Sequence, residues 1–214
     1  HDLGATYRGK KIGGIADLTV FSFHPVKSIT TGEGGAILTN NEKYYKKLLL
    51  LRSHGITKDE NGFNVMTELG YNYRLTDFQA SLGISQLKKL NGFIKKRRQV
   101  VKLYEKCLSG FDGVILPIVE SSLHSAWHLF VIRVSHPENR LPLYNHLRQA
   151  GVGVNFHYPA VYSHPYYQKN GFSGVRCPNA EKYAATTITL PLHVLLTQRD
   201  VIFITKTVKD YFRK

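Results

Sequence analysis

The sequence is poor in cysteine, in acidic residues and in long apolar runs. Its 214 residues include two cysteines, Cys107 and Cys177, and 15 Asp+Glu against 29 Lys+Arg. Two cysteines are too few for the disulfide framework of a secreted domain, so we expect a cytoplasmic protein in a reducing compartment. No apolar run reaches the roughly 18–20 residues of a membrane-spanning helix, so we expect no membrane partner. The 43% of hydrophobic residues excludes a disordered chain and predicts a globular core.

The shortage of acidic residues leaves a formal net charge of +14, which raises the question of nucleic-acid binding. Eight of the basic residues lie between Lys88 and Lys106, together with apolar residues at helical spacing. This pattern predicts an amphipathic helix with a solvated basic side. A nucleic-acid site usually adds exposed aromatic residues, a glycine-rich RNA motif or a helix-turn-helix; none is recognisable, and we expect no nucleic-acid partner. The alternative is a non-catalytic protein, or a catalytically impaired fragment, that binds a partner through the Lys88–Lys106 face.

Strand and helix patterns alternate along the chain. Runs rich in apolar and β-branched residues predict strands over 16–23, 35–39, 127–134 and 152–156. Helical spacing and capping residues predict helices over 42–52, from 76 or 77 through the basic stretch, over 139–150, over 179–187 and from 197 to 212. Residues 56–74 are expected to form a long irregular loop. The alternation predicts an α/β or α+β architecture, and the glycines near residue 110 predict a domain boundary.

The residues best suited to chemistry lie between positions 20 and 35. Lys27 follows a predicted strand, among hydroxyl groups, glycines and a histidine. A lysine amine can form a Schiff base, a hydroxyl such as that of Ser22 can bind phosphate oxygens, and glycines let the backbone approach a ligand closely. These residue types suit a phosphorylated aldehyde cofactor. The alternative, an ordinary solvent-exposed loop lysine, stays open on the residues alone.

Other kinds of site fit the sequence poorly. The glycines of Gly32-Glu33-Gly34-Gly35 precede a predicted strand and lack the following Lys-Ser/Thr pair, which excludes a Walker loop and a dinucleotide-binding motif. His157 and His164 have no cysteine or carboxylate nearby in the sequence, so we expect no metal site. Cys177 is expected to be structural rather than nucleophilic.

Four segments in a fixed order resemble one known family. The first is Ser22-Phe23-His24-Pro25-Val26-Lys27 followed by Gly32-Glu33-Gly34-Gly35, and the second is Gly70-Tyr71-Asn72-Tyr73-Arg74-Leu75-Thr76-Asp77-Phe78-Gln79-Ala80. The third and fourth are His157-Tyr158-Pro159 with Pro165-Tyr166-Tyr167, and Cys177-Pro178-Asn179-Ala180-Glu181 with Leu190-Pro191-Leu192. Together they resemble the DegT-type nucleotide-sugar aminotransferases, which are fold type I enzymes that use pyridoxal 5'-phosphate (PLP).

The resemblance implies a role for each matching residue. Lys27 would hold PLP as a Schiff base and move the proton during catalysis, and Ser22 would bind the PLP phosphate. Asn72 would reach the cofactor of a neighbouring subunit, which implies a homodimer with a shared active site. Four further residues would line the entrance for the amino donor and the sugar nucleotide: His24, Arg74, His157 and Tyr158.

The resemblance also implies a substrate and a domain plan. The sequence of the first segment is most similar to that of members in pseudaminic acid-type surface-sugar biosynthesis. These members transfer an amino group to a UDP-4-keto-6-deoxy-N-acetylhexosamine, with glutamate as the usual donor. Residues 1–108 would complete the large PLP-binding domain, and residues 109–214 would form the small C-terminal domain. Family members that use the cofactor for dehydration carry histidine in place of Lys27, and the lysine disfavours that alternative.

The sequence departs from the family in length. Family members are considerably longer, and the opening His1-Asp2-Leu3-Gly4-Ala5 lacks a methionine and resembles the interior of a protein. Asp2 does not align with the family's aspartate that pairs with the pyridine nitrogen. We therefore expect the chain to be the C-terminal part of a longer enzyme.

Overall fold

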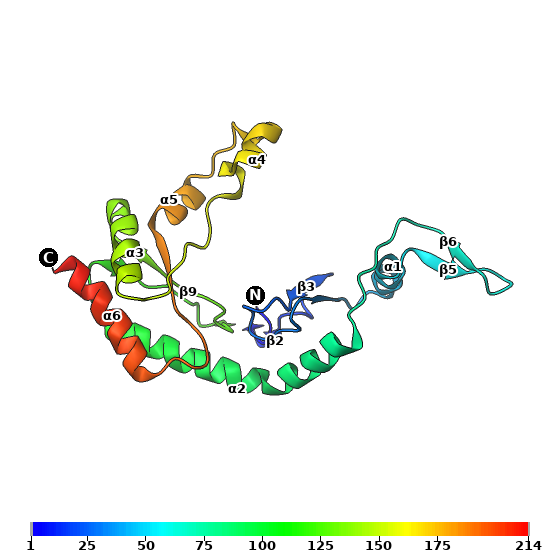
Figure 1. Cartoon of the computed structure of the whole chain (residues 1–214), viewed down its shortest axis with the longest axis horizontal. Coiled ribbons are helices and arrows are strands. Elements are labelled where there is room, and N and C mark those ends of the chain that lie inside the picture. Colours follow the sequence, from blue (N-terminus) through cyan, green and yellow to red (C-terminus); the bar gives the residue numbers. More distant parts are fainter. Residues whose placement is uncertain (1, 214) are drawn as a thin grey trace. The chain divides into compact units, whose positions relative to one another are not determined.

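A computed structural model describes residues 2–213 as a mixture of helices and antiparallel strands (Figure 1). The strands pair in two three-stranded sheets, of order β2-β1-β8 and β10-β9-β7, and in two hairpins, β3-β4 and β5-β6. The packing divides the chain into two compact units. The first contains the chain up to Ile94 together with Glu120–Ala126, and the second contains Lys95–Val119 and the chain from Trp127 onward.

The first unit carries the predicted lysine segment. Its elements are β1 (Thr6–Tyr7), β2 (Lys10–Lys11), β3 (Thr19–Ser22), β4 (Gly35–Leu38), α1 (Glu42–Arg52), β5 (Ile56–Lys58), β6 (Asn64–Met66), β8 (Leu123–His124) and the first part of α2 (Asp77–Leu108). The side chain of Asn41 caps α1 by accepting hydrogen bonds from the N–H groups of Lys43 and Tyr44. A small buried cluster joins α2 to the segment before β1, to the loop after β3 and to the segment after β8, and it contains Ala5, Ile29, Leu90, Ile94 and Ala126.

The second unit is built on the sheet of β7 (Val114–Ile115), β9 (Phe130–Val134) and β10 (Thr187–Leu190). Its helices are the last part of α2, α3 (Arg140–Gln149), α5 (Pro178–Thr186) and α6 (Gln198–Phe212), with short helical turns at Pro137–Asn139, Val161–Ser163, α4 (Pro165–Tyr167) and Gln168–Phe172. Strand β9 alternates buried and half-buried residues, whereas all four residues of β10 are buried. The sheet and the helices enclose one continuous apolar core that includes Tyr104, Phe130, Leu147 and Val208.

Helix α2 is continuous from Asp77 to Leu108, as its apolar spacing predicts, and the division between the units falls within it (Figure 1). Its lysines, from Lys88 to Lys106, are exposed, which confirms the solvated basic side. Arg97 departs from that prediction because its side chain is only 6% exposed. Its Nη1 donates to the carbonyl oxygens of Trp127, His128 and Leu192 at 3.2, 3.1 and 3.0 Å. Burial lowers the pKa of the Arg97 guanidinium.

Three sequence predictions require correction. Residues 56–74 contain the β5-β6 hairpin rather than an irregular loop alone. Residues 152–156 form no strand and contribute a single bridge between Asn155 and Thr189. Residues 187–190, expected to end a helix, form the edge strand β10, which is buried and pairs antiparallel with β9. The assignment of domains to residues 1–108 and 109–214 stays a prediction.

Within residues 2–213, none of the helices combines the length and the apolar character needed to span a lipid bilayer.

Candidate active site

Lys27 lies in a loop of residues 23–34, which we call the lysine loop and which joins β3 to β4. The hairpin register places Ser22 opposite Gly35, so the loop begins and ends at neighbouring points of the backbone. Its two ends are joined because Phe23 N–H donates to Gly34 O at 2.8 Å. The Phe23 carbonyl accepts two further bonds, from the N–H of Thr31 and the hydroxyl of Thr30, each at 3.0 Å. These bonds fold the loop back on itself and give Lys27 a defined position in it.

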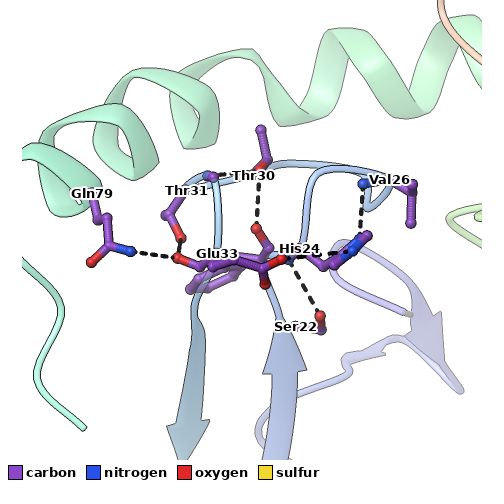
Figure 2. A network of polar contacts seen from close by, with 9 residues as sticks. Ser22, His24, Val26, Thr30, Thr31, Glu33 and Gln79 are labelled. Carbon is purple, nitrogen blue, oxygen red and sulfur yellow. Dashed lines mark hydrogen bonds and ion pairs between the residues drawn. The ribbon is translucent and has the colours of Figure 1, made fainter. Parts of the chain in front are cut away.

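The turn before Lys27 is organised by Ser22 and His24 (Figure 2). Lys27 N–H donates to His24 O at 3.0 Å, and Val26 N–H donates to His24 Nδ1 at 3.3 Å. A neutral imidazole that accepts at Nδ1 carries its hydrogen on Nε2, which lies 3.7 Å from Glu33 Oε1. His24 N–H donates to Ser22 Oγ at 3.3 Å, so the Ser22 hydroxyl keeps its own hydrogen for another acceptor. The predicted substrate contact of His24 stays a prediction.

Beside the turn is a small hollow of about 10 Å³, lined by Leu3, Phe21, Ser22, Lys27, Ser28 and Ile29. Lys27 is half-buried there, and Ser28 is 8% exposed. The Oγ atom of Ser28 is buried without a hydrogen-bond partner among the described residues. A buried hydroxyl normally has a partner, because leaving it unpaired costs about 1–3 kcal/mol. The hollow has room for about one water molecule. The hollow by itself is therefore too small to enclose a cofactor.

Asn72 and Arg74 lie on a second segment of the same unit, between β6 and α2. This segment lies against the end of α1, because Tyr71 N–H donates to Leu51 O at 2.8 Å and Tyr73 N–H donates to Arg52 O at 3.0 Å. Asn72 forms an isolated backbone bridge with Ser53. The side chains of Asn72 and Arg74 are both exposed, so neither is used in the interior of the unit.

Two glycines permit this arrangement. A Cβ atom on Gly55 would lie 1.9 Å from Glu68 O, and one on Gly70 would lie 2.1 Å from Gly55 N. Gly55 also has a positive φ of 67°, a conformation that residues with a side chain rarely adopt. The backbone can therefore cross itself here only with glycine at both positions, which explains the Gly at the start of the Gly70–Leu75 segment.

His157 and Tyr158 belong to the second unit and lie on the segment between α3 and α5. His157 Nδ1 lies 2.7 Å from Thr189 Oγ1 on β10, and the Tyr158 side chain is exposed. The two C-terminal signature segments are tied together by Tyr162, whose hydroxyl donates to Glu181 Oε1 at 2.7 Å and accepts from Cys177 N–H at 3.0 Å. Desolvation and the hydrogen bond to Glu181 raise the pKa of Tyr162.

The structure thus places His24 and Lys27 on the lysine loop, Ser22 at the end of β3 directly before it, and Asn72 and Arg74 on a second segment of the same unit. His157 and Tyr158 lie in the other unit, and their predicted role, like that of the other five, stays a prediction. The sequence prediction missed the buried hydroxyl of Ser28 and the contact of Gln79 with the lysine loop (Figure 2). The Thr76-x-x-Gln79 spacing is a capping-box pattern and was a usable signal for Gln79.

Residues 1–209 match the DegT/DnrJ/EryC1/StrS aminotransferase family. The chain belongs to this family. The resemblance seen in the four segments is thereby confirmed, and so is the expected mixed α/β fold of a C-terminal part of such an aminotransferase.

Relatives and solved structures of the family align with nearly the whole chain. A UDP-4-amino-4,6-dideoxy-N-acetyl-beta-L-altrosamine transaminase of Campylobacter jejuni is 39% identical in an alignment 217 residues long, which covers 100% of this chain and 57% of the relative. Helicobacter pylori PseC, an aminotransferase involved in the biosynthesis of pseudoaminic acid, has a TM-score of 0.92 and 32% identity over 99% of this chain and 57% of its own. The PLP form of Streptococcus pneumoniae Spr1654, a proposed sugar aminotransferase, has a TM-score of 0.92 and 32% identity over 100% and 56%.

The chain spans about 57% of the length of the curated relatives it matches. Family membership therefore concerns this portion, which carries the lysine loop, the Gly70–Leu75 segment and the second unit.

Proposed function

We propose that this chain is part of a PLP-dependent aminotransferase that converts a UDP-4-keto-6-deoxy-N-acetylhexosamine to the 4-amino sugar, with glutamate as the amino donor. The observation that carries the proposal is Lys27, half-buried at a hollow between the hydroxyls of Ser22 and Ser28, in a member of an aminotransferase family. The choice of sugar is supported by the names of relatives, which include the altrosamine transaminase and PseC. The product would enter pseudaminic acid-type surface-sugar synthesis in the cytoplasm, where the free thiols of Cys107 and Cys177 remain reduced.

The lysine loop fits one side of a phosphorylated pyridine aldehyde. Together with Ser22 directly before it, the loop offers an amine at Lys27, a hydroxyl with its own hydrogen available at Ser22, and at Ser28 a buried hydroxyl that has no partner among the described residues. An amine reacts with an aldehyde, and hydroxyl groups donate to phosphate oxygens. These groups would therefore hold the aldehyde and phosphate ends of PLP, whose electron-withdrawing ring supplies a sink for electrons from the reacting carbon. The hollow is too small for the pyridine ring of PLP, so other parts of the protein must supply the remaining contacts with that ring.

Lys27 has two tasks in this proposal. Its Nζ atom would hold the cofactor covalently before substrate binds. Once released, the same nitrogen would be a neutral amine that moves a proton from the donor carbon to the cofactor in the first half-reaction, and from the cofactor to the sugar carbon in the second. Both tasks require the Nζ atom to be held in place, and the hydrogen bonds of the lysine loop fix the backbone that carries this side chain.

The remaining residues bind and orient the substrates. A role in binding glutamate or the sugar nucleotide is assigned to His24 and Arg74 of the first unit and, separately, to His157 and Tyr158 of the second. Arg74 is exposed and positively charged, which suits a carboxylate or a diphosphate. The net charge of +14 would add a general attraction for these anionic substrates.

The exposed surface of the first unit supports a homodimer with a shared active site. Large apolar side chains near Asn72 face outward, among them Leu69, Tyr73 and Phe78, and Phe78 is 91% exposed. Apolar surface of this kind is typical of protein interfaces. A second subunit packed there would cover it and would bring Asn72 to the phosphate of the partner's cofactor.

Substitution of Lys27 in the complete protein tests the proposal. We expect Lys27→Ala to lower the turnover of glutamate-dependent amination of the UDP-4-keto sugar by at least about 1,000-fold, because covalent binding and proton transfer are both lost. The exposed Lys10→Ala is the matched control and should keep normal turnover. Full turnover in Lys27→Ala would contradict the proposal. If the wild-type protein aminated a different keto sugar and not the UDP-4-keto sugar, the assigned substrate would be wrong.

A further inference from the structure

We propose that Gln79 is a positioning residue that fixes the lysine loop on helix α2 and thereby sets the position of Lys27. The proposal rests on the proposed function of Lys27. Gln79 lies one turn into α2, and its Nε2 donates to Glu33 O of the lysine loop at 3.0 Å (Figure 2). This bond joins residues that are 46 positions apart in the sequence, whereas the bonds described above for the loop join residues within it.

The other end of the Gln79 amide is fixed by the start of the helix. Gln79 Oε1 accepts from Thr76 N–H at 3.0 Å and lies 3.2 Å from Thr76 Oγ1, while Gln79 N–H donates to Thr76 Oγ1 at 3.3 Å. This is a capping box with glutamine at its third helical position. The oxygen of the amide is held by the helix terminus, so its nitrogen is aimed at the loop with little freedom.

A second contact one turn later places the loop against the same face of the helix. Gly83 follows Gln79 by four residues, and residues at this spacing lie on one side of a helix. A Cβ atom on Gly83 would lie 2.9 Å from Thr31 Cγ2, and Thr31 is only 3% exposed. Thr31 Oγ1 donates to Glu33 O at 2.7 Å, the same carbonyl that accepts from Gln79. The helix therefore holds the loop by a hydrogen bond and by a close packing contact that meet at Thr31 and Glu33.

The two ends of Gln79 have different chemical requirements. Capping needs only an acceptor oxygen, which a glutamate supplies equally well or better at a helix N-terminus. The bond to the Glu33 carbonyl needs an N–H donor, which a glutamate at neutral pH lacks. Gln79→Glu should therefore preserve the cap and break the contact with the lysine loop, placing a carboxylate against a carbonyl oxygen.

The experiment compares Gln79→Glu with wild type in the complete, PLP-loaded protein. We expect kcat for the glutamate half-reaction to fall about 10-fold with KM changed less than twofold, because displacement of Lys27 slows proton transfer more than binding. The deuterium isotope effect with Cα-deuterated glutamate should rise, since proton transfer becomes more rate-limiting. The melting temperature should stay within about 2 °C, because the cap remains. Gln99→Glu, an exposed change of the same charge on the same helix, is the matched control.

Gly83→Ala supplies an independent variant. Alanine favours the helix over glycine, so a purely structural effect predicts equal or higher stability and unchanged turnover. The proposal predicts that the added methyl group displaces Thr31, lowers kcat about threefold and raises the same isotope effect. If both variants keep wild-type kcat and isotope effect while wild-type Lys27 is shown to hold PLP, the role of Gln79 is overturned and the proposed function stands. If wild-type Lys27 holds no PLP, the proposed function fails first.

Discussion

The two compact units hold their parts in place by different means. In the second unit, sheet and helices share one apolar core that extends from Val100 to Val208 along the sequence. In the first unit, the buried apolar cluster contains five of the described residues, and much of its large apolar surface faces outward. The lysine loop and the Gly70–Leu75 segment are held there by backbone bonds, glycine crossings and one glutamine side chain.

This difference has a consequence for function. A core residue of the second unit contributes to stability through burial, and its loss destabilises that unit. A polar contact of the first unit contributes little to stability but fixes the position of Lys27. Substitutions in the core of the second unit should therefore change the free energy of unfolding, whereas substitutions of polar contacts in the first unit should change turnover.

The largest effect on stability is expected from Phe130→Ala in the second unit. Phe130 is fully buried, and its ring stacks on Tyr104 with centroids 4.8 Å apart. Removing it should lower the free energy of unfolding by about 3–5 kcal/mol, measured by urea denaturation of the complete protein. The comparison substitution is Phe78→Ala in the first unit, whose effect should depend on protein concentration because a subunit interface is involved. A cost of 3–5 kcal/mol for Phe78→Ala at every concentration would show that the first unit has a core of its own around Phe78.

The fold was predictable where one local signal decides it. The helix over 42–52 follows from its spacing and from Asn41 as cap, and the long α2 follows from the apolar residues Leu90, Ile94, Val101 and Tyr104. The β5-β6 hairpin was missed because its strands are three residues long and fully exposed, so they show no alternation. Strand β10 was missed because four consecutive buried residues next to a helix have no period of two.

The sequence predicts individual residues of the candidate site, but it does not predict the contacts between segments that position them. Lys27, Ser22 and Asn72 stand in recognisable segments. The Thr76-x-x-Gln79 spacing indicates the helix cap, but it does not indicate the contact of Gln79 with Glu33, which joins two distant segments. The burial of Arg97 was not predictable either, because its charge resembles that of the exposed lysines beside it. Only the three carbonyl oxygens that converge on it distinguish this position.

A smaller loss of stability is expected from Arg97→Met, which tests a buried polar contact of the second unit instead of an apolar one. The substitution removes a donor to three carbonyl oxygens but also relieves the cost of burying a charge, so the two terms partly cancel. We expect a loss of about 2–3 kcal/mol in the free energy of unfolding, with normal turnover per folded molecule. Lys102→Met, on an exposed position of the same helix, should change stability by less than about 0.5 kcal/mol. A stabilised Arg97→Met variant would contradict the assignment of a structural role.

The smallest effect is a pH dependence that differs between two helix caps. Helix α6 is capped by Thr197 and Asp200, whose carboxylate accepts from Thr197 N–H at 2.8 Å and from its hydroxyl at 2.7 Å. These bonds lower the pKa of Asp200 in the folded protein. Its contribution is therefore complete above about pH 4, the range of an unfolded aspartate, and is lost as the pH falls through the lower folded value.

The cap of α2 uses the neutral amide of Gln79 and should show no such dependence. Amide hydrogen exchange at the first turns of α6 and α2 measures both caps in one sample. We expect protection at the start of α6 to weaken in acid relative to α2, and Asp200→Asn to abolish the difference. Equal acid sensitivity at both helix starts would contradict this account of the caps.

The central claim is that Lys27 holds PLP, and borohydride reduction of the complete, PLP-loaded protein tests it most directly. Reduction turns a lysine–PLP Schiff base into a stable secondary amine, which peptide mass mapping then locates. The account predicts one labelled peptide, carrying the modification on Lys27, and no label in Lys27→Ala. A modification on another lysine, or a wild-type protein that remains unlabelled while it binds PLP, would contradict it.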